Sequence, residues 1–158
     1  MKTTTTYDRA LNMLAFRARS AAELRRQLLR KGEPAADVEA AIARLLEQRL
    51  LNDEDFARQF TRLKLSGGGA SRLRIIQELG RKGIGRPLAE EAIDAVRDDD
   101  GLDASESIHR VATKKWRTLA KLDDGTARRR LYAFLARRGF NPEEIRGAMS
   151  AIGAATDP

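Results

Sequence analysis

Hydrophobic residues recur along the whole chain at close to the 3.6-residue period of an α-helix, and no alternating run is long enough for a strand. Three of the helical segments end in the same way, with two basic residues and a glycine, and a proline follows within four residues. The three endings are Arg30-Lys31-Gly32, Arg81-Lys82-Gly83 and Arg137-Arg138-Gly139. Self-similarity of this kind predicts an all-α protein, built as an elongated tandem array of three units.

Each unit is predicted to hold three helices. In the first unit, Ser20-Ala21-Ala22-Glu23 has the form of a capping box that starts the second helix, Gly32 ends that helix, and Pro34 starts the third. The predicted divisions are a flexible tail at residues 1–6, units at 7–50, 51–100 and 101–152, and a flexible tail at 153–158.

Two segments are predicted to be loops. Ser66-Gly67-Gly68-Gly69 lies inside the second unit, and Asp98-Asp99-Asp100-Gly101 links the second unit to the third. The acidic segment could act as a hinge that adjusts the curvature of the array, or it could be a solvated linker without consequence.

Composition narrows the class of partner. Among 158 residues, 30 Lys and Arg face 23 Asp and Glu, which leaves a formal charge of +7. A basic protein favours a polyanion, with nucleic acid first and an anionic membrane or an acidic protein next. There is no cysteine and no apolar stretch long enough to cross a bilayer, and the N-terminus lacks the apolar run of a signal peptide. We therefore expect a cytoplasmic protein without a membrane partner.

The basic residues concentrate in the second helix of each unit, and the net charges of these helices are +3, +3 and +5. The third helices each sum to −1. If equivalent helices share a face, the array carries a positive ridge that suits a phosphate backbone. The residues predicted to bind DNA or a protein–DNA filament are Arg25, Arg26, Arg30, Lys31, Arg72, Arg74, Arg81, Lys82, Arg128, Arg129, Arg130, Arg137 and Arg138.

A structural explanation competes for some of these residues. Basic side chains in a last helical turn interact favourably with the helix dipole, so the three repeated endings are also explained as simple helix stops. The dipole does not explain Arg72, Arg74 or the run from Arg128 to Arg130, because these cations begin their helices. For them the binding interpretation is preferred.

The sequence contains few residues that could act in catalysis, bind a metal ion or stack on a base. His109 is the single histidine and has no nucleophile or metal ligand arranged around it, and Asp98 to Asp100 are more typical of a linker than of a magnesium site. Trp116 could stack on a base, but it lies in register with Ile108 and Ala112, which favours a core role. We predict a protein that is not an enzyme and that has no cofactor and no metal.

Three motifs resemble successive signatures of the bacterial RecX family. They are Arg17-Ala18-Arg19-Ser20-Ala21-Ala22-Glu23-Leu24 through Gly32, Leu51-Asn52-Asp53-Glu54-Asp55-Phe56-Ala57, and Arg72 through Glu78-Leu79-Gly80-Arg81-Lys82-Gly83-Ile84. The resemblance implies a modular all-α regulator of the RecA recombinase that lies in the groove of the RecA filament on single-stranded DNA. It further implies inhibition of ATP hydrolysis and strand exchange, in homologous recombination, DNA repair and the SOS response. The third unit departs most from the pattern, with a long first helix and an Asp123-Asp124 linker.

Two other functions remain open at the level of sequence. One is a helical-repeat nucleic-acid-binding protein without a recombinase partner, for which the basic ridge alone suffices. The other is a protein-binding adaptor that uses the acidic third helices and leaves free DNA unbound. We expect modest, salt-sensitive binding to single-stranded DNA and a monomer.

Overall fold

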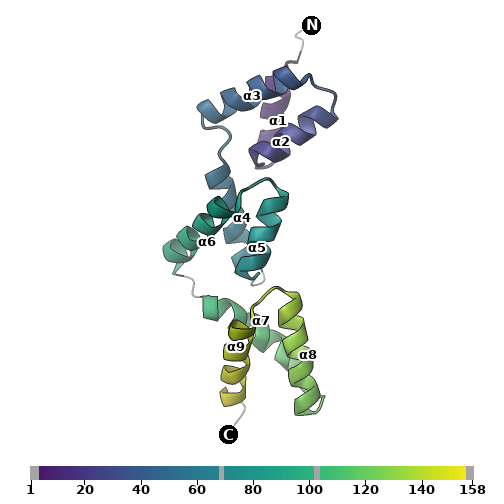
Figure 1. Ribbon diagram of the computed structural model, residues 1–158, viewed down its shortest axis with the longest axis vertical. Coiled ribbons are helices and arrows are strands. Elements are labelled where there is room, and N and C mark those ends of the chain that lie inside the picture. The colour runs from purple at the N-terminus through teal and green to yellow at the C-terminus, as the bar shows by residue number, and fades with distance from the viewer. Residues whose placement is uncertain (1–3, 68–69, 102–103, 156–158) are drawn as a thin grey trace.

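The computed structural model describes residues 4–67, 70–101 and 104–155, and these residues form nine α-helices and no strand. The predicted all-α array is confirmed (Figure 1). The helices are α1 (Thr6–Phe16), α2 (Ala21–Arg30), α3 (Ala35–Glu47), α4 (Asp53–Ser66), α5 (Arg72–Arg81), α6 (Arg86–Asp100), α7 (Ala104–Thr118), α8 (Asp124–Arg137) and α9 (Pro142–Ala155).

Each consecutive set of three helices encloses its own hydrophobic core, so the chain has three small cores in a row. Leu28, Leu79 and Leu135 occupy matching positions in the three units, and all three are fully buried. Burial of the same position in every unit shows that the sequence repeat is a structural repeat. The helices pack mainly within their own unit, as in other arrays of helical repeats.

The helix ends follow the local chemistry of the sequence. Ser20, Asn52 and Ser71 each accept a hydrogen bond from a backbone N–H of the first turn that follows. Gly32, Gly83 and Gly139 take φ values of 83°, 81° and 89°, which is the left-handed conformation that ends a helix and that favours glycine. The interpretation of the three repeated endings as helix stops is confirmed.

Several local predictions differ from the structure. The proposed capping box at Ser20 is only half formed, because the Glu23 carboxylate pairs with Arg17 at 2.6 Å. The linker predicted at Asp98–Gly101 is wrong in its first three residues, because α6 continues to Asp100 and ends at Gly101, which has a φ of 61°. An ion pair of 2.9 Å between Arg62 and Asp100 ties this last turn of α6 to α4.

The chain ends also differ from the prediction in part. The helix α1 begins at Thr6, with Thr5 as its N-cap, and α9 runs to Ala155 instead of ending near Ile152. The rest of the two predicted tails, residues 1–3 and 156–158, lies outside the described residues, as do Gly68 and Gly69 of the predicted glycine loop.

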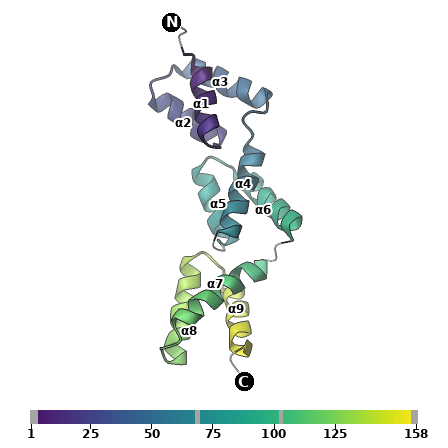
Figure 2. The same ribbon diagram turned by 180° about the vertical axis from the view of Figure 1, so that it is seen from behind.

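The three units follow one another along the long axis of the molecule, and both views show an extended shape (Figures 1 and 2). The second helices α2, α5 and α8 lie along one side, and the third helices α3, α6 and α9 lie along the other. Equivalent helices therefore do share a side of the array.

Candidate nucleic-acid interface

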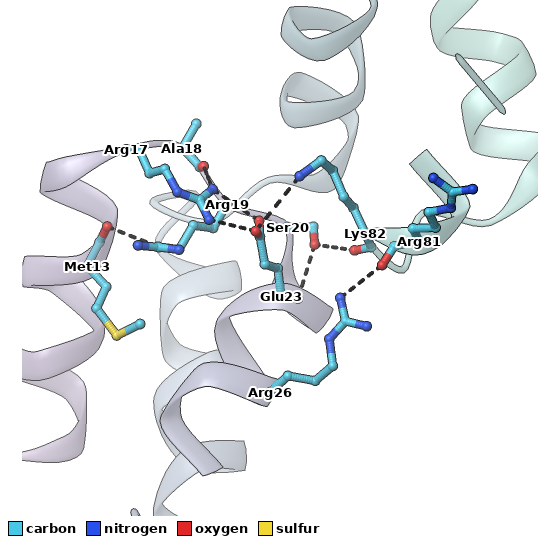
Figure 3. Close-up of polar contacts among 9 residues, drawn as sticks. All are labelled: Met13, Arg17, Ala18, Arg19, Ser20, Glu23, Arg26, Arg81 and Lys82. Carbon is cyan, nitrogen blue, oxygen red and sulfur yellow. Dashed lines mark hydrogen bonds and ion pairs between the residues drawn. The ribbon is translucent and has the colours of Figure 1, made fainter. Parts of the chain in front are cut away.

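The side formed by α2, α5 and α8 is built by contacts between the end of one helix and the start of another. At the first junction, the Ser20 hydroxyl at the N-cap of α2 donates a hydrogen bond to the Lys82 carbonyl at the C-cap of α5 (Figure 3). The Arg26 guanidinium donates to the Arg81 carbonyl at 3.1 Å, and the Glu23 carboxylate lies 3.9 Å from the Lys82 ammonium. The start of α2 is thus fixed on the end of α5.

The second junction repeats the first. The Ser71 hydroxyl at the N-cap of α5 donates to the Arg138 carbonyl at the C-cap of α8, at 3.2 Å. The same oxygen accepts a hydrogen bond from the Arg74 backbone N–H at 3.2 Å. One serine therefore caps its own helix and joins it to the next unit.

The glycines at these junctions have a second role besides ending a helix. A Cβ on Gly83 would lie 2.3 Å from the Ala22 Cβ, and a Cβ on Gly139 would lie 2.7 Å from the Ser71 Oγ. A Cβ on Gly32, at the outer end of α2, would meet nothing within 4 Å. The chain therefore approaches closely at both junctions, whereas Gly32 is needed only for its positive φ.

These contacts join α2, α5 and α8 into a column, which we call the basic column. The N-terminus of α2 faces the C-terminus of α5, and the N-terminus of α5 faces the C-terminus of α8. Helix dipoles in this arrangement run in one direction, so opposite partial charges meet at each junction. The columnar arrangement brings the three second helices, which carry the predicted cations, to one side of the molecule (Figures 1 and 2).

Many of the predicted binding residues form ion pairs within the protein. Arg25 pairs with Glu39 at 2.6 Å, Arg72 with Asp94 at 2.5 Å, Arg74 with Glu78 at 3.1 Å and Arg128 with Asp124 at 2.7 Å. The net charge of +5 predicted for the third basic helix was too high, because α8 begins at Asp124 and includes that carboxylate. Arg72, Arg74 and Arg128, which begin their helices, thus have a structural explanation that the dipole argument lacked.

These pairs shift the pKa values of their members. Hydrogen bonds from Arg25 and Arg72 lower the pKa values of Glu39 and Asp94, and the carboxylates raise the pKa values of the two arginines in turn. Both carboxylates therefore stay ionised at neutral pH and partly neutralise the basic column.

Some of the other predicted residues form no ion pair with a described residue, and others contact an aromatic ring or a hydroxyl group. Within the described part of the chain, no ion pair is formed by Arg30, Lys31, Arg81, Arg130 or Arg137, and all five side chains are exposed. The Lys82 ammonium lies over the Phe56 and Phe60 rings, Arg129 donates to the Thr126 hydroxyl, and Arg138 lies over the Phe134 ring.

A group of cations on α7 was not among the predicted binding residues. Arg110, Lys114 and Lys115 lie on a first helix, and they meet Arg138 of the basic column at a pocket between the second and third units. The spacing of Arg110 and Lys114, four residues apart, was a signal that they share a helix face. These cations were not predicted because the predicted binding residues came from the second helix of each unit, whereas α7 is a first helix.

The remaining candidates have ordinary surroundings. Trp116 is half-buried and packs against the core of the third unit, as its register predicted. Among the described residues, no group of three His, Cys, Asp or Glu side chains is placed to hold a metal ion. A search of the same residues finds no helix that is both long enough and apolar enough to span a membrane.

Comparison with known proteins matches all three units. Family models described as the first, second and third three-helix domains of RecX match residues 7–45, 52–93 and 103–149. The regulatory protein RecX of Pelodictyon phaeoclathratiforme is 32% identical over 143 residues, which cover 90% of this chain and 86% of the relative. The regulatory protein RecX of Deinococcus radiodurans is 35% identical over 149 residues, or 94% of this chain and 69% of the relative.

Solved structures share the fold. The crystal structure of RecX from Lactobacillus salivarius superposes with a TM-score of 0.82 over 94% of this chain and 95% of that chain, at 21% identity. A second crystal structure, of a regulatory protein RecX, gives a TM-score of 0.79 over 92% of this chain and 70% of that chain, also at 21% identity.

Proposed function

Because this chain belongs to the RecX family of regulatory proteins, we propose that it binds the RecA filament on single-stranded DNA and suppresses its ATPase and strand-exchange activities. It would do so as a monomer in the cytoplasm, without a cofactor and without catalysis of its own. The processes concerned are homologous recombination and the SOS response.

The observation that carries this proposal is the basic column. Its helices have 10, 10 and 14 residues, and at about 1.5 Å per residue they extend over about 50 Å when joined end to end. A small domain is about 30 Å across, so this surface is long enough to reach more than one subunit of a filament. An extended ligand that follows a groove can therefore act on several recombinase subunits at once.

The distribution of charge supports contact with DNA as well as with protein. The exposed cations Arg30, Lys31, Arg130 and Arg137 are spread from one end of the column toward the other. Cations without a carboxylate partner displace counterions from phosphates, which makes binding to single-stranded DNA sensitive to salt. The internal ion pairs limit how many such contacts form, so binding to DNA alone is expected to be modest.

A titration of preformed RecA filaments with this protein tests the proposal. We expect the ATPase and strand-exchange rates to fall when fewer than one molecule is present per recombinase monomer, since each molecule would touch several subunits. A requirement for equal or greater amounts, or no effect on the cognate recombinase, would contradict the proposal.

The cations around the α7 pocket favour a second candidate, a helical-repeat nucleic-acid-binding protein without a recombinase partner. Such a protein would bind single-stranded DNA equally well with and without RecA, and its effect on strand exchange would disappear when DNA is in excess. Measuring inhibition at two DNA concentrations separates the two functions.

A further inference from the structure

A cationic pocket of about 490 Å³ lies where the second unit meets the third. Its wall contains Arg110, Lys114 and Lys115 of α7, Phe134 of α8, and Arg138 at the C-cap of α8, and the end of α4 closes one side at Gly67. Of the described residues, no carboxylate lines it. Pockets of this size hold small ligands or single building blocks of larger ones.

Phe134 organises two of these cations. The Lys115 ammonium lies 5.1 Å from the centre of the Phe134 ring, and the Arg138 guanidinium carbon lies 5.0 Å from it. Distances below about 6 Å are those of cation–π contacts, which hold a cation in place without neutralising it. The aromatic ring thus positions the Lys115 ammonium and the Arg138 guanidinium at the pocket.

Two further hollows near the junction between the units share lining residues with this pocket. A second hollow, lined by Lys64, Arg74 and Arg138, shares Gly67 and Arg138 with the first. A third, lined by Arg74, Arg81 and Arg137, lies beside Gly139. Glu78, which lines the third hollow, pairs with Lys64 and Arg74, whereas the α7 pocket has only cations among its charged lining residues.

We propose that the α7 pocket, formed by Arg110, Lys114, Lys115 and Arg138 with Phe134 as a positioning residue, binds phosphodiester groups of single-stranded DNA where the strand crosses the junction of the second and third units. This inference rests on the proposed function, because it assigns the DNA contact of that function to one site. The chemistry recognised is phosphate, and three hollows that share Arg138 as a lining residue fit a strand in preference to a free nucleotide.

The test uses two double variants of equal charge in the full chain. Arg110→Gln with Lys114→Gln alters the pocket, whereas Arg117→Gln with Lys121→Gln removes two exposed cations that do not line it. Binding of a fluorescent oligothymidylate is measured across a series of salt concentrations, and circular dichroism checks that both variants are folded. For single strands, each phosphate contact contributes about 0.7 to the slope of log affinity against log salt.

We expect the pocket variant to lose about tenfold or more in affinity at low salt and about 1.4 in slope, while the control keeps the wild-type slope. Phe134→Leu should weaken binding several-fold, and Phe134→Tyr should keep it near the wild-type level, because tyrosine offers an aromatic face to Lys115 and Arg138 and leucine does not. Equal losses in the two double variants would overturn the site. Competition by ATP beyond that of chloride at the same ionic strength would also overturn it, in favour of a free nucleotide.

The same variants separate this inference from the proposed function. If the wild-type protein inhibits RecA filaments and the pocket variant binds DNA normally, the pocket assignment fails and the function stands. If the wild-type protein leaves RecA unaffected while the pocket variant alone loses DNA binding, the function fails and the site stands.

Discussion

At the scale of single residues, the three repeated glycines have unequal roles. All three have a positive φ, but only Gly83 and Gly139 lie against a neighbouring unit. The same kind of ending, two basic residues and a glycine, therefore corresponds to a helix end away from a junction in one unit and to a junction in the other two.

We predict that Gly32→Ala lowers the free energy of unfolding by about 1–2 kcal/mol, the cost of a left-handed conformation in a residue with a Cβ. Gly83→Ala should cost more, because the new methyl group would overlap Ala22 and push the first two units apart. Urea unfolding measures both costs, and small-angle scattering should report a changed molecular length for Gly83→Ala alone. If the two variants lose the same free energy of unfolding and have the same molecular length, the close approach of Gly83 to Ala22 does not contribute to stability.

A second prediction at this scale compares paired and unpaired cations. Arg30→Gln with Lys31→Gln should reduce the salt dependence of DNA binding and change stability by less than about 0.5 kcal/mol. Arg72→Gln with Arg74→Gln should reduce the salt dependence less, because both guanidiniums are already committed to carboxylates. Oligonucleotide titrations at several salt concentrations compare the two. A larger loss of slope in the paired variant would mean that these ion pairs open on binding.

At the scale of helices, the N-cap serines connect local structure to assembly. Ser20 and Ser71 cap α2 and α5 and also donate across a junction, whereas Asp123 caps α8 at the outer end of the basic column. A hydroxyl both accepts and donates, but a carboxylate only accepts. A serine thus caps each second helix whose start meets another second helix, and within the described residues the start of α8, which meets none, is capped by an aspartate.

We predict that Ser71→Asp keeps α5 capped but breaks the second junction, because a carboxylate cannot donate to the Arg138 carbonyl. Helical content should stay at the wild-type level, while hydrogen exchange at the end of α8 should increase. Asp123→Ser is the matched control and should leave exchange unchanged. Wild-type exchange in Ser71→Asp would mean that packing alone holds the units together.

The ion pairs of the first junction give a dependence on pH. A hydrogen bond from Arg17, together with the nearby Lys82, lowers the pKa of Glu23 below its ordinary value of 4.5. A carboxylate with a lowered pKa stabilises the folded state at and above its ordinary pKa, and this contribution is lost as the pH falls through the lowered value. We expect the difference in urea midpoint between the wild type and Glu23→Gln to shrink from about pH 5 downwards. A constant difference would contradict this role, and Glu47→Gln, at an exposed position, is the control.

At the scale of the whole molecule, the array is long because its cores are separate. Each unit buries its own leucines and isoleucines, whereas the described contacts between units include hydrogen bonds at the ends of helices, an ion pair between Glu23 and Lys82, and the close approach of Gly83 to Ala22. Apolar burial therefore stabilises the units, and polar contacts at the junctions orient them.

We predict a radius of gyration clearly above about 15 Å, the value for a compact domain of 158 residues. Small-angle scattering on a sample of monomeric mass, checked by light scattering, provides the measurement. A value near 15 Å would mean that the units fold back on one another in solution.

The sequence by itself determined the fold class, the three repeated units and most helix ends. These features depend on helical periodicity, caps and left-handed glycines, which involve residues a few positions apart in the chain. The burial of Leu28, Leu79 and Leu135 at matching positions follows from the same periodicity. The concentration of charge in the second helices was also readable, because it requires only the helix boundaries.

Tertiary structure alone decided which cations remain without a carboxylate partner and where the units meet. The hydroxyls of Ser20 and Ser71 reach carbonyls 62 and 67 residues away, and Arg72 meets Asp94 from a different helix. The α7 cations approach Arg138 only because the third unit folds its first helix against its second. Such partners depend on the orientation of whole helices, which the packing of the cores determines and which no local spacing in the sequence encodes.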